Sequence, residues 1–153
     1  LLRKKEIYDG ATPSGNAVMA VNLLRLSILF DKPAWGKMAE KMAESIASVT
    51  IKYPTSFGVW LSLIHELVSG TNEIALVGED AEKILPDILR IYIPYRVFMT
   101  STKSDAGFPL IADKNFKGKT LIFLCRNYAC QKPVETVKEL ETLINQNNYK
   151  PEQ

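Results

Sequence analysis

Four polar residues gather in the short stretch DGATPSGN, directly before a long apolar run: Asp9, Thr12, Ser14 and Asn16. Each carries an oxygen or an amide that can form a hydrogen bond with a hydroxyl group. The N-terminus of a helix adds unpaired backbone N–H groups and a positive dipole, which favour such ligands. The stretch therefore has two interpretations, a tight turn with a helix cap or the polar wall of a ligand pocket. Because caps are common and the motif is short, the residues by themselves favour the cap.

The second candidate is the pair Cys125 and Cys130 in CRNYAC. Four residues separate these candidate thiols, whereas a thioredoxin-type motif has two. A disulfide requires the two Cα atoms to lie close in space, which the spacing does not establish. Residue type favours one buried thiol at a strand end and one thiol in a loop. With His65 as the single histidine and no further cysteine, we expect no metal site and no cofactor.

Two other features carry weaker signals. The stretch LVGEDAEK places Gly78 between an apolar run and a helix start, but it lacks both the G-x-G-x-x-G and the P-loop pattern. Glu79 and Asp80 would also repel a phosphate there, so we interpret the stretch as a loop in which Asp80 caps a helix. Nucleotide binding is the least favoured function. His65 lies at the edge of an apolar helix face without a recognisable nucleophile motif, which is weak evidence for catalysis.

The composition of the chain narrows the function classes. The 153 residues are 46% hydrophobic and 24% charged, as in ordinary globular proteins, and they suit one domain or slightly more. The formal net charge of +2 is too small to indicate nucleic acid or an anionic membrane as a partner. The apolar run 17–30 is too short to span a bilayer. Two cysteines make no disulfide framework, so we expect a reducing, cytoplasmic location. A first residue that is Leu indicates a fragment or a processed chain.

Residues 1–70 read as a helical segment. Thr12 is the expected N-cap of a first helix, with Pro13 at the first helical position, where its missing N–H costs nothing. This helix is apolar on most sides, so we expect other elements to enclose it. An amphipathic helix follows from about Pro33, and a third helix runs from about Ser56 to Ser69.

Residues 71–153 read as an α/β segment because the hydrophobic period changes after Gly70. Three short apolar runs are expected strands, EIALVG, YRVFMTS and TLIFLC, and a polar loop covers 102–119. One helix follows Asp80, where Pro86 marks either a kink or the true start, and another begins near Pro133. Continuous apolar strands joined by helices predict a parallel sheet. The predicted fold class is α + α/β: antiparallel helices followed by a small three-stranded, mainly parallel sheet with flanking helices.

Taken together, four stretches resemble the C-terminal part of a thioredoxin-domain-containing family that includes the spermatogenesis-associated thioredoxin-like proteins and bacterial relatives. The stretches follow one another along nearly the whole chain: EIYDGATPSGNAVMAVNLLRLSILF, NEIALVGE, IYIPYRVFMTS and LIFLCRNYACQKPVETVKEL. The most specific parts are DGATPSGN and the pattern C-x-N-x-x-C-x-x-P. Members carry an N-terminal thioredoxin-like domain and a helical region that looks like the six-hairpin (α/α) barrels of glycosidases and N-acylglucosamine 2-epimerases.

The resemblance implies a function for the parent protein rather than for this chain. Residues 1–70 would supply the last hairpins of the barrel, and the loop 9–16 would face a cavity that binds a sugar-like molecule. Asp9 would then be a general base or a hydroxyl acceptor. Because the thioredoxin-like domain is absent here, Cys125 and Cys130 do not inherit its redox role. A carbohydrate epimerase or glycosidase-like activity would belong to the parent.

The sequence thus predicts a non-catalytic C-terminal module of a larger protein, which contributes to the rim of a sugar-binding cavity. The remainder of the parent chain would be its partner. The alternative is an interaction or oligomerisation domain, because uncovered apolar helix faces lead to self-association.

Overall fold

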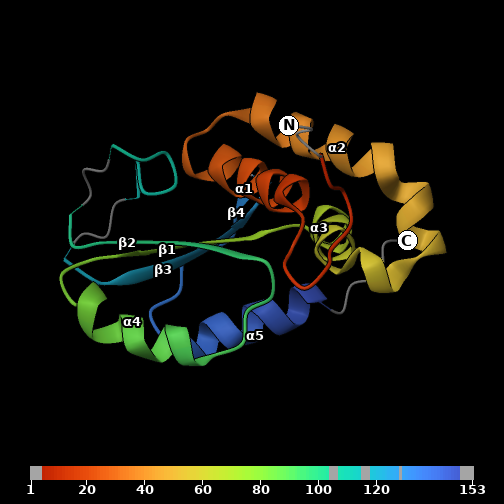
Figure 1. Ribbon diagram of the computed structural model, residues 1–153. Coiled ribbons are helices and arrows are strands. Elements are labelled where there is room, and N and C mark those ends of the chain that lie inside the picture. Colours follow the sequence, from red (N-terminus) through yellow and green to blue (C-terminus); the bar gives the residue numbers. More distant parts are fainter. Residues whose placement is uncertain (1–4, 104–106, 115–117, 128, 149–153) are drawn as a thin grey trace. The chain divides into compact units, whose positions relative to one another are not determined.

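The computed structural model describes residues 5–103, 107–114, 118–127 and 129–148 (Figure 1). The chain divides into two compact units, Leu1–Gly70 and Thr71–Gln153. The first unit is helical, and the second combines a sheet with helices.

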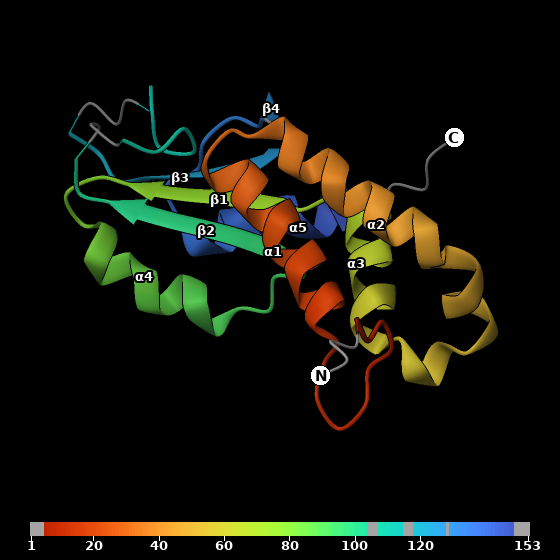
Figure 2. The ribbon, with the colours of Figure 1, turned by 45° about the horizontal axis from the view of Figure 1, so that its top comes forward.

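The first unit contains three helices and a short 3-10 turn: α1 (Gly15–Leu29), α2 (Pro33–Lys52), η1 (Pro54–Ser56) and α3 (Gly58–Ser69). Only three residues join α1 to α2, and the two helices lie side by side (Figure 2). Their facing stripes are rich in alanine, which lets the helix axes approach closely. The core of the unit comprises Ala17, Ala20, Ala43, Ile46, Phe57, Trp60 and Leu63.

The first helix starts two residues later than predicted. Ser14, not Thr12, is the N-cap, since its Oγ accepts the backbone N–H of Ala17 at 3.2 Å and its backbone is extended. Pro13 consequently precedes the helix and does not occupy its first turn. Serine and threonine both cap helices well, so residue type alone did not distinguish Thr12 from Ser14.

The prediction that other elements enclose α1 was wrong. Its buried residues, Ala17, Ala20, Ser27 and Ile28, form one narrow stripe. Ala17 and Ala20 of this stripe belong to the core that α1 forms with α2 and α3. The exposed apolar side chains on and beside the helix are Val18, Met19, Leu26 and Phe30.

The second unit is built on a four-stranded mixed sheet, which corrects the predicted three-stranded, mainly parallel sheet. Its strands are β1 (Asn72–Val77), β2 (Arg96–Ser101), β3 (Leu121–Arg126) and β4 (Ala129–Cys130), in the order β2-β1-β3-β4. The α4 helix (Ala81–Arg90) connects β1 to its parallel neighbour β2. By contrast, β3 runs antiparallel to both β1 and β4. The fold therefore remains α + β.

The direction of β3 follows from the connection that precedes it. A strand lies parallel to its predecessor only if a crossover carries the chain back to the opposite end of the sheet. No helix lies in the described part of the 102–120 connection, and β3 begins where β1 ends, with Leu121 opposite Val77. Residues 104–106 and 115–117 of the predicted polar loop lie outside the described residues.

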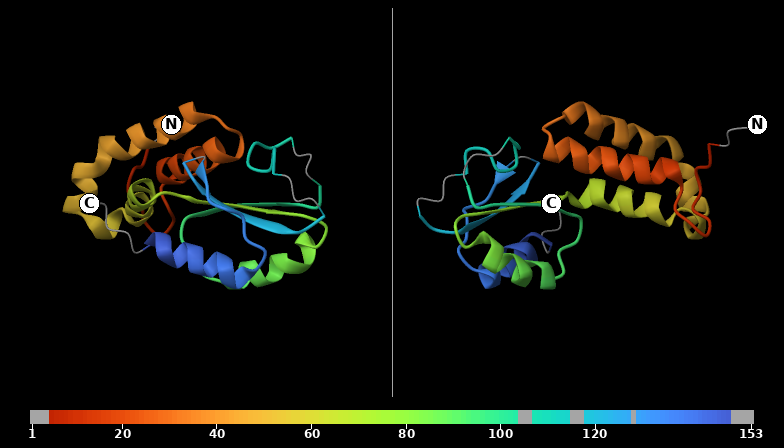
Figure 3. Two further views of the ribbon diagram at one scale, coloured as in Figure 1. Left: turned by 180° about the vertical axis from the view of Figure 1, so that it is seen from behind. Right: turned by 60° about the vertical axis from the view of Figure 1, so that its left-hand side comes forward.

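Two helices cover one face of this sheet, as both α4 and α5 (Val137–Asn148) lie on the same side of it (Figure 3). Side chains from that face form the core of the unit together with the two helices: Ile74, Leu76, Ala81, Ile88, Ile93, Ile122, Leu124, Leu140 and Ile144. Pro86 is inside α4, so it does not mark the start of that helix.

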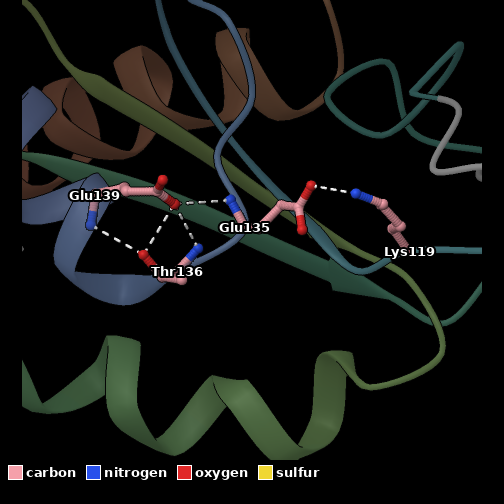
Figure 4. A network of polar contacts seen from close by, with 4 residues as sticks. All are labelled: Lys119, Glu135, Thr136 and Glu139. Carbon is pink, nitrogen blue, oxygen red and sulfur yellow. Dashed lines mark hydrogen bonds and ion pairs between the residues drawn. The ribbon is translucent and has the colours of Figure 1, made fainter.

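The last helix starts at Val137, four residues after the expected Pro133, because a reciprocal cap sets its start. The Thr136 Oγ1 accepts the backbone N–H of Glu139 at 3.2 Å, while Glu139 Oε2 accepts the backbone N–H of Thr136 at 3.0 Å (Figure 4). The Thr136 hydroxyl also donates to Glu139 Oε2 at 2.9 Å, and this bond, with those from the backbone N–H groups of Thr136 and Glu135, holds the pKa of Glu139 below its ordinary value of 4.5. The neighbouring Glu135 pairs with Lys119 at 2.6 Å, which ties the start of β3 to the chain before α5.

Candidate functional site

The polar stretch before α1 borders a hollow of about 840 Å³. This volume lies within the range of roughly 300 to 1,000 Å³ that is usual for small-ligand sites. The lining residues come from the chain segment before α1 and from the first turns of that helix: Lys5, Glu6, Tyr8, Gly10, Ala11, Thr12, Pro13, Ser14, Gly15, Asn16 and Met19. Three of the four predicted site residues therefore share one surface, and Asp9 is not among the lining residues.

Asp9 is half-buried and connects two distant segments. Its Oδ1 accepts the backbone N–H of Ser14 at 2.8 Å, and its Oδ2 accepts the backbone N–H of Val59 at 2.8 Å. Its own backbone N–H donates to the carbonyl of Ser56 at 2.8 Å. Both acceptor oxygens thus lie at the start of a helix, where a carboxylate is favoured by the dipole. This geometry gives Asp9 a structural role, holding the loop against the start of α3.

Ser14 and Asn16 fix the other side of the loop. The buried Ser14 hydroxyl donates to the carbonyl of Glu6 at 3.2 Å while it caps α1. Asn16 Nδ2 donates to the same carbonyl at 2.6 Å. The indole Nε1 of Trp60 donates to the carbonyl of Ile7 at 2.6 Å, so the core of the unit also anchors this segment. The loop therefore has a defined shape, which a binding surface needs.

Of the four predicted site residues, only Thr12 is an exposed residue of the hollow's lining, and other exposed residues join it there. Thr12 and Tyr8 are exposed and present hydroxyl groups, and Lys5 and Glu6 add opposite charges. A Cβ atom at Gly10 or Gly15 would meet no atom within 4 Å, so the backbone is open to close approach at both positions. Such a surface can exchange hydrogen bonds with a small polar molecule. Tyr8 had no motif of its own, and only its closeness to the loop could have drawn attention to it.

The two cysteines are joined. A disulfide links Cys125 to Cys130, which are paired residues of β3 and β4. The interpretation as one strand thiol and one loop thiol missed this because β4, a strand of two residues, has no hydrophobic period to reveal it. Asn127 lies in the two-residue connection with a φ of +49°, in the left-handed region that tight hairpins require.

Gly78 serves the packing of the sheet rather than a phosphate. Its φ is +143°, and a Cβ atom there would lie 2.4 Å from Thr120 Cα. The backbone of the residue before β3 thus occupies the space that the missing side chain leaves. Thr120 Oγ1 also accepts the backbone N–H of Asp80 at 2.9 Å. His65 is exposed, and its Nδ1 lies 3.1 Å from the hydroxyl of Ser69, one turn further along α3.

The face of the sheet opposite α4 and α5 carries a charged group that the sequence did not single out. Lys114 Nζ lies 5.5 Å from the ring centroid of Phe123, within the range of a cation–π contact. Burial lowers the pKa of Lys114 below its ordinary value of 10.5, and the negative charges of Glu73 and Asp113 partly oppose this effect. The loop that carries Lys114 has no periodicity, so no sequence signal predicted this placement.

Among residues 5–103, 107–114, 118–127 and 129–148, no group of three or more His, Cys, Asp and Glu side chains is placed to hold a metal ion. Within those same ranges, no helix is long and apolar enough to cross a membrane.

Comparison with known proteins finds relatives along nearly the whole chain. The chain is 24% identical over 155 residues to spermatogenesis-associated protein 20 of Rattus norvegicus, a match that covers 95% of this chain and 20% of that protein. The corresponding protein of Homo sapiens is 23% identical, with 94% and 20% covered. An uncharacterized protein of Caenorhabditis elegans is 22% identical, with 94% and 21% covered.

These similarities agree with the predicted resemblance to the spermatogenesis-associated proteins. The chain spans about a fifth of the length of the curated relatives it matches. No protein-family model matches the chain, and no solved structure matches it. The comparisons therefore give no support to a six-hairpin barrel or to a role in carbohydrate metabolism.

Proposed function

We propose that the chain acts as a non-catalytic binding module within a longer protein, and that the hollow before α1 binds a small polyhydroxyl molecule of the sugar class. The observation that carries this proposal is the hollow itself, since one polar stretch supplies most of the residues that line its volume of about 840 Å³. The hydroxyl groups of Thr12 and Tyr8 would exchange hydrogen bonds with ligand hydroxyls, and the open backbone at Gly10 and Gly15 would let the ligand approach.

The predicted role of Asp9 changes within this proposal. Both of its carboxylate oxygens accept backbone N–H groups, and it does not line the hollow. Asp9 would therefore support the binding loop instead of acting as a general base. Ser14 and Asn16 would likewise shape the loop, because each hydrogen-bonds the carbonyl of Glu6.

The test is a titration with D-glucose, N-acetyl-D-glucosamine and myo-inositol, followed by amide chemical shifts in two-dimensional NMR. We expect shifts at Gly10 and Gly15 for at least one probe. Thr12→Val should weaken binding about fivefold, because the loss of one hydrogen bond of about 1 kcal/mol corresponds to that factor. Thr100→Val is the matched control, since Thr100 is equally an exposed threonine but lies on β2. The proposal would be refuted if Thr12→Val left the affinity unchanged, or if no probe changed the amide chemical shifts.

The second candidate function is protein–protein association, and it is favoured by the exposed apolar side chains of α1. Val18 is 41% and Met19 is 55% exposed, although the helix is apolar on most sides. Exposed apolar patches mark interfaces. Sedimentation equilibrium should detect self-association that Met19→Lys abolishes and Val68→Lys leaves intact, since Val68 is 79% exposed on α3. A chain that stays monomeric at every concentration would exclude self-association through this surface.

A further inference from the structure

We propose that the Cys125–Cys130 disulfide is a site of thiol–disulfide exchange, at which a dithiol attacks Cys130. This inference is independent of the hollow before α1. It rests on the place of the disulfide in the sheet, on the unequal exposure of its two sulfur-bearing residues, and on the hydrogen bonds that hold the hairpin without it.

The disulfide lies at the border of the sheet. The order β2-β1-β3-β4 makes β4 an edge strand, and the pair Cys125–Cys130 bridges that edge to the inner strand β3. An edge strand leaves one side of its backbone uncovered by further strands. A reactant can therefore reach Cys130 without breaking the hydrogen bonds between the strands of the sheet.

The two cysteines differ in exposure, which sets the direction of attack. Cys125 is 2% exposed, whereas Cys130 is exposed. Exchange depends on which sulfur a thiolate can reach. Cys130 Sγ is thus the accessible electrophile, and Cys125 Sγ is the leaving group.

The exchange balances with a dithiol as the co-reactant. One thiolate of the dithiol attacks Cys130 Sγ, so that a mixed disulfide forms while the Sγ–Sγ bond breaks. The electron pair of the broken bond goes to Cys125 Sγ, which takes up the proton that the attacking thiol released. The second thiolate of the dithiol then attacks the first sulfur of the dithiol, which is bonded to Cys130 Sγ in the mixed disulfide. Cys130 leaves as a thiolate and is protonated in turn. The protein gains two thiols, and the dithiol is oxidised to a cyclic disulfide.

The hairpin has other attachments that survive this cleavage. The backbone N–H of Gln131 donates to the carbonyl of Leu124 at 2.9 Å. Ile122 and Val134 exchange two backbone hydrogen bonds, at 2.8 and 2.9 Å. Cleavage should therefore loosen the edge strand and leave β3 paired with the chain that follows it, so that the bond can open and close in the folded protein.

A buried glutamate lies opposite Cys125 and affects the reactivity of its thiol. Glu73 is the ladder partner of Cys125 on β1 and is 3% exposed, and the side chains of two directly opposed residues share one face of a sheet. The thiol released at Cys125 is thus enclosed beside a carboxyl group, while the one released at Cys130 faces solvent. Unequal thiol reactivity is the expected consequence, because burial in such surroundings disfavours the thiolate.

The experiment follows the reduction of the full chain in its native state. The chain is purified without reductant, incubated with dithiothreitol at neutral pH, quenched with an alkylating reagent and weighed by mass spectrometry. We expect a native reduction rate within about tenfold of the rate in guanidinium chloride. A bond that opens only through global unfolding would react more than about a thousandfold slower, because unfolding costs at least several kcal/mol. Such slow reduction, or a chain isolated with two alkylatable thiols, would overturn the proposal.

A second arm tests the direction of attack in the wild-type chain, so it does not depend on the folding of any variant. Reduced glutathione replaces dithiothreitol, and peptide mapping locates the trapped adduct. We expect it on Cys130, and an adduct mainly on Cys125 would contradict the assignment. In the single variants, Cys125→Ser should leave a thiol that alkylates at least about tenfold faster than the thiol left by Cys130→Ser, because access and thiolate character set the rate.

Discussion

Replacing Asp9 with alanine should destabilise the helical unit, because one carboxylate holds two segments that are far apart in the sequence. Its two oxygens accept the backbone N–H groups of Ser14 and Val59, each at 2.8 Å. A hydrogen bond to a charged group contributes about 1.5 to 3 kcal/mol. Both amides lie near helix starts, where water partly replaces the lost acceptor, so the lower end of this range applies. We therefore expect a total loss of about 3 kcal/mol.

Asp9→Asn removes the charge and one acceptor oxygen but keeps a side chain of the same shape, whereas Asp9→Ala removes both acceptors. The amide keeps one acceptor oxygen and presents a donor in place of the other, so only one of the two hydrogen bonds survives. We expect about half the effect, roughly 1.5 kcal/mol. A ranking in which Asp9→Asn equals the wild-type protein would mean that one of the two contacts contributes nothing.

The assay is urea denaturation followed by tryptophan fluorescence. Trp35 and Trp60 are the two tryptophans of the chain, and both lie in the helical unit, so the signal reports the unfolding of that unit. The midpoint should shift at an unchanged denaturant slope. Glu44→Ala is the control, since it removes one exposed acidic residue from α2 and should change stability by less than about 0.5 kcal/mol. A loss below about 1 kcal/mol for Asp9→Ala would refute the idea that this carboxylate clamps the loop.

Three further predictions concern the sheet unit and the glycines. Gly78→Ala should lower the free energy of unfolding by about 3 kcal/mol or more, because it combines an unfavourable φ with a clash against the Thr120 backbone. Gly15→Ala should be neutral or stabilising by up to about 1 kcal/mol. Thermal unfolding of the two variants checks both expectations. The pKa of Glu139 should lie below 4.5 and rise when its hydrogen-bond partner is lost in Thr136→Ala, as a carbon-detected NMR titration would show. Because that folded pKa is lowered, the stabilisation is fully present above about pH 4.5 and is lost as the pH falls through the lower folded value; a pKa at or above 4.5 would contradict the cap. Cys130→Ser should lower the free energy of unfolding by about 2 kcal/mol, because a disulfide with a sequence separation of 5 constrains the unfolded chain only weakly. Denaturant unfolding monitored by circular dichroism measures this loss. A loss above about 4 kcal/mol would show additional native contacts at Cys130.

The sequence by itself located most of the helices and strands. Periodicity placed α2 from Pro33 and the strands β1, β2 and β3, because these signals reside within each segment. Local chemistry also gave the end of α3 at Gly70, where a φ of +81° suits a residue without a Cβ atom. The start of α5 was misplaced although the T-x-x-E pattern of a capping box, Thr136 to Glu139, was present in the sequence.

Other features depended on contacts between distant segments, and no local signal could supply them. The direction of β3 depends on the connection before it, whose described part holds no crossover helix, and apolar runs look the same in a parallel or an antiparallel sheet. The pairing of Cys125 with Cys130 required β4, whose two residues carry no period.

The stretch DGATPSGN shows the same division. Its composition predicted a cap and a polar loop, and the cap at Ser14 and the hollow beside Thr12 both lie there. The role of Asp9 could be decided only by the tertiary structure, because the amide of Val59 that binds its carboxylate is 50 residues away in the chain. A sequence determines which groups can form hydrogen bonds, whereas the packing of helices determines which of them meet.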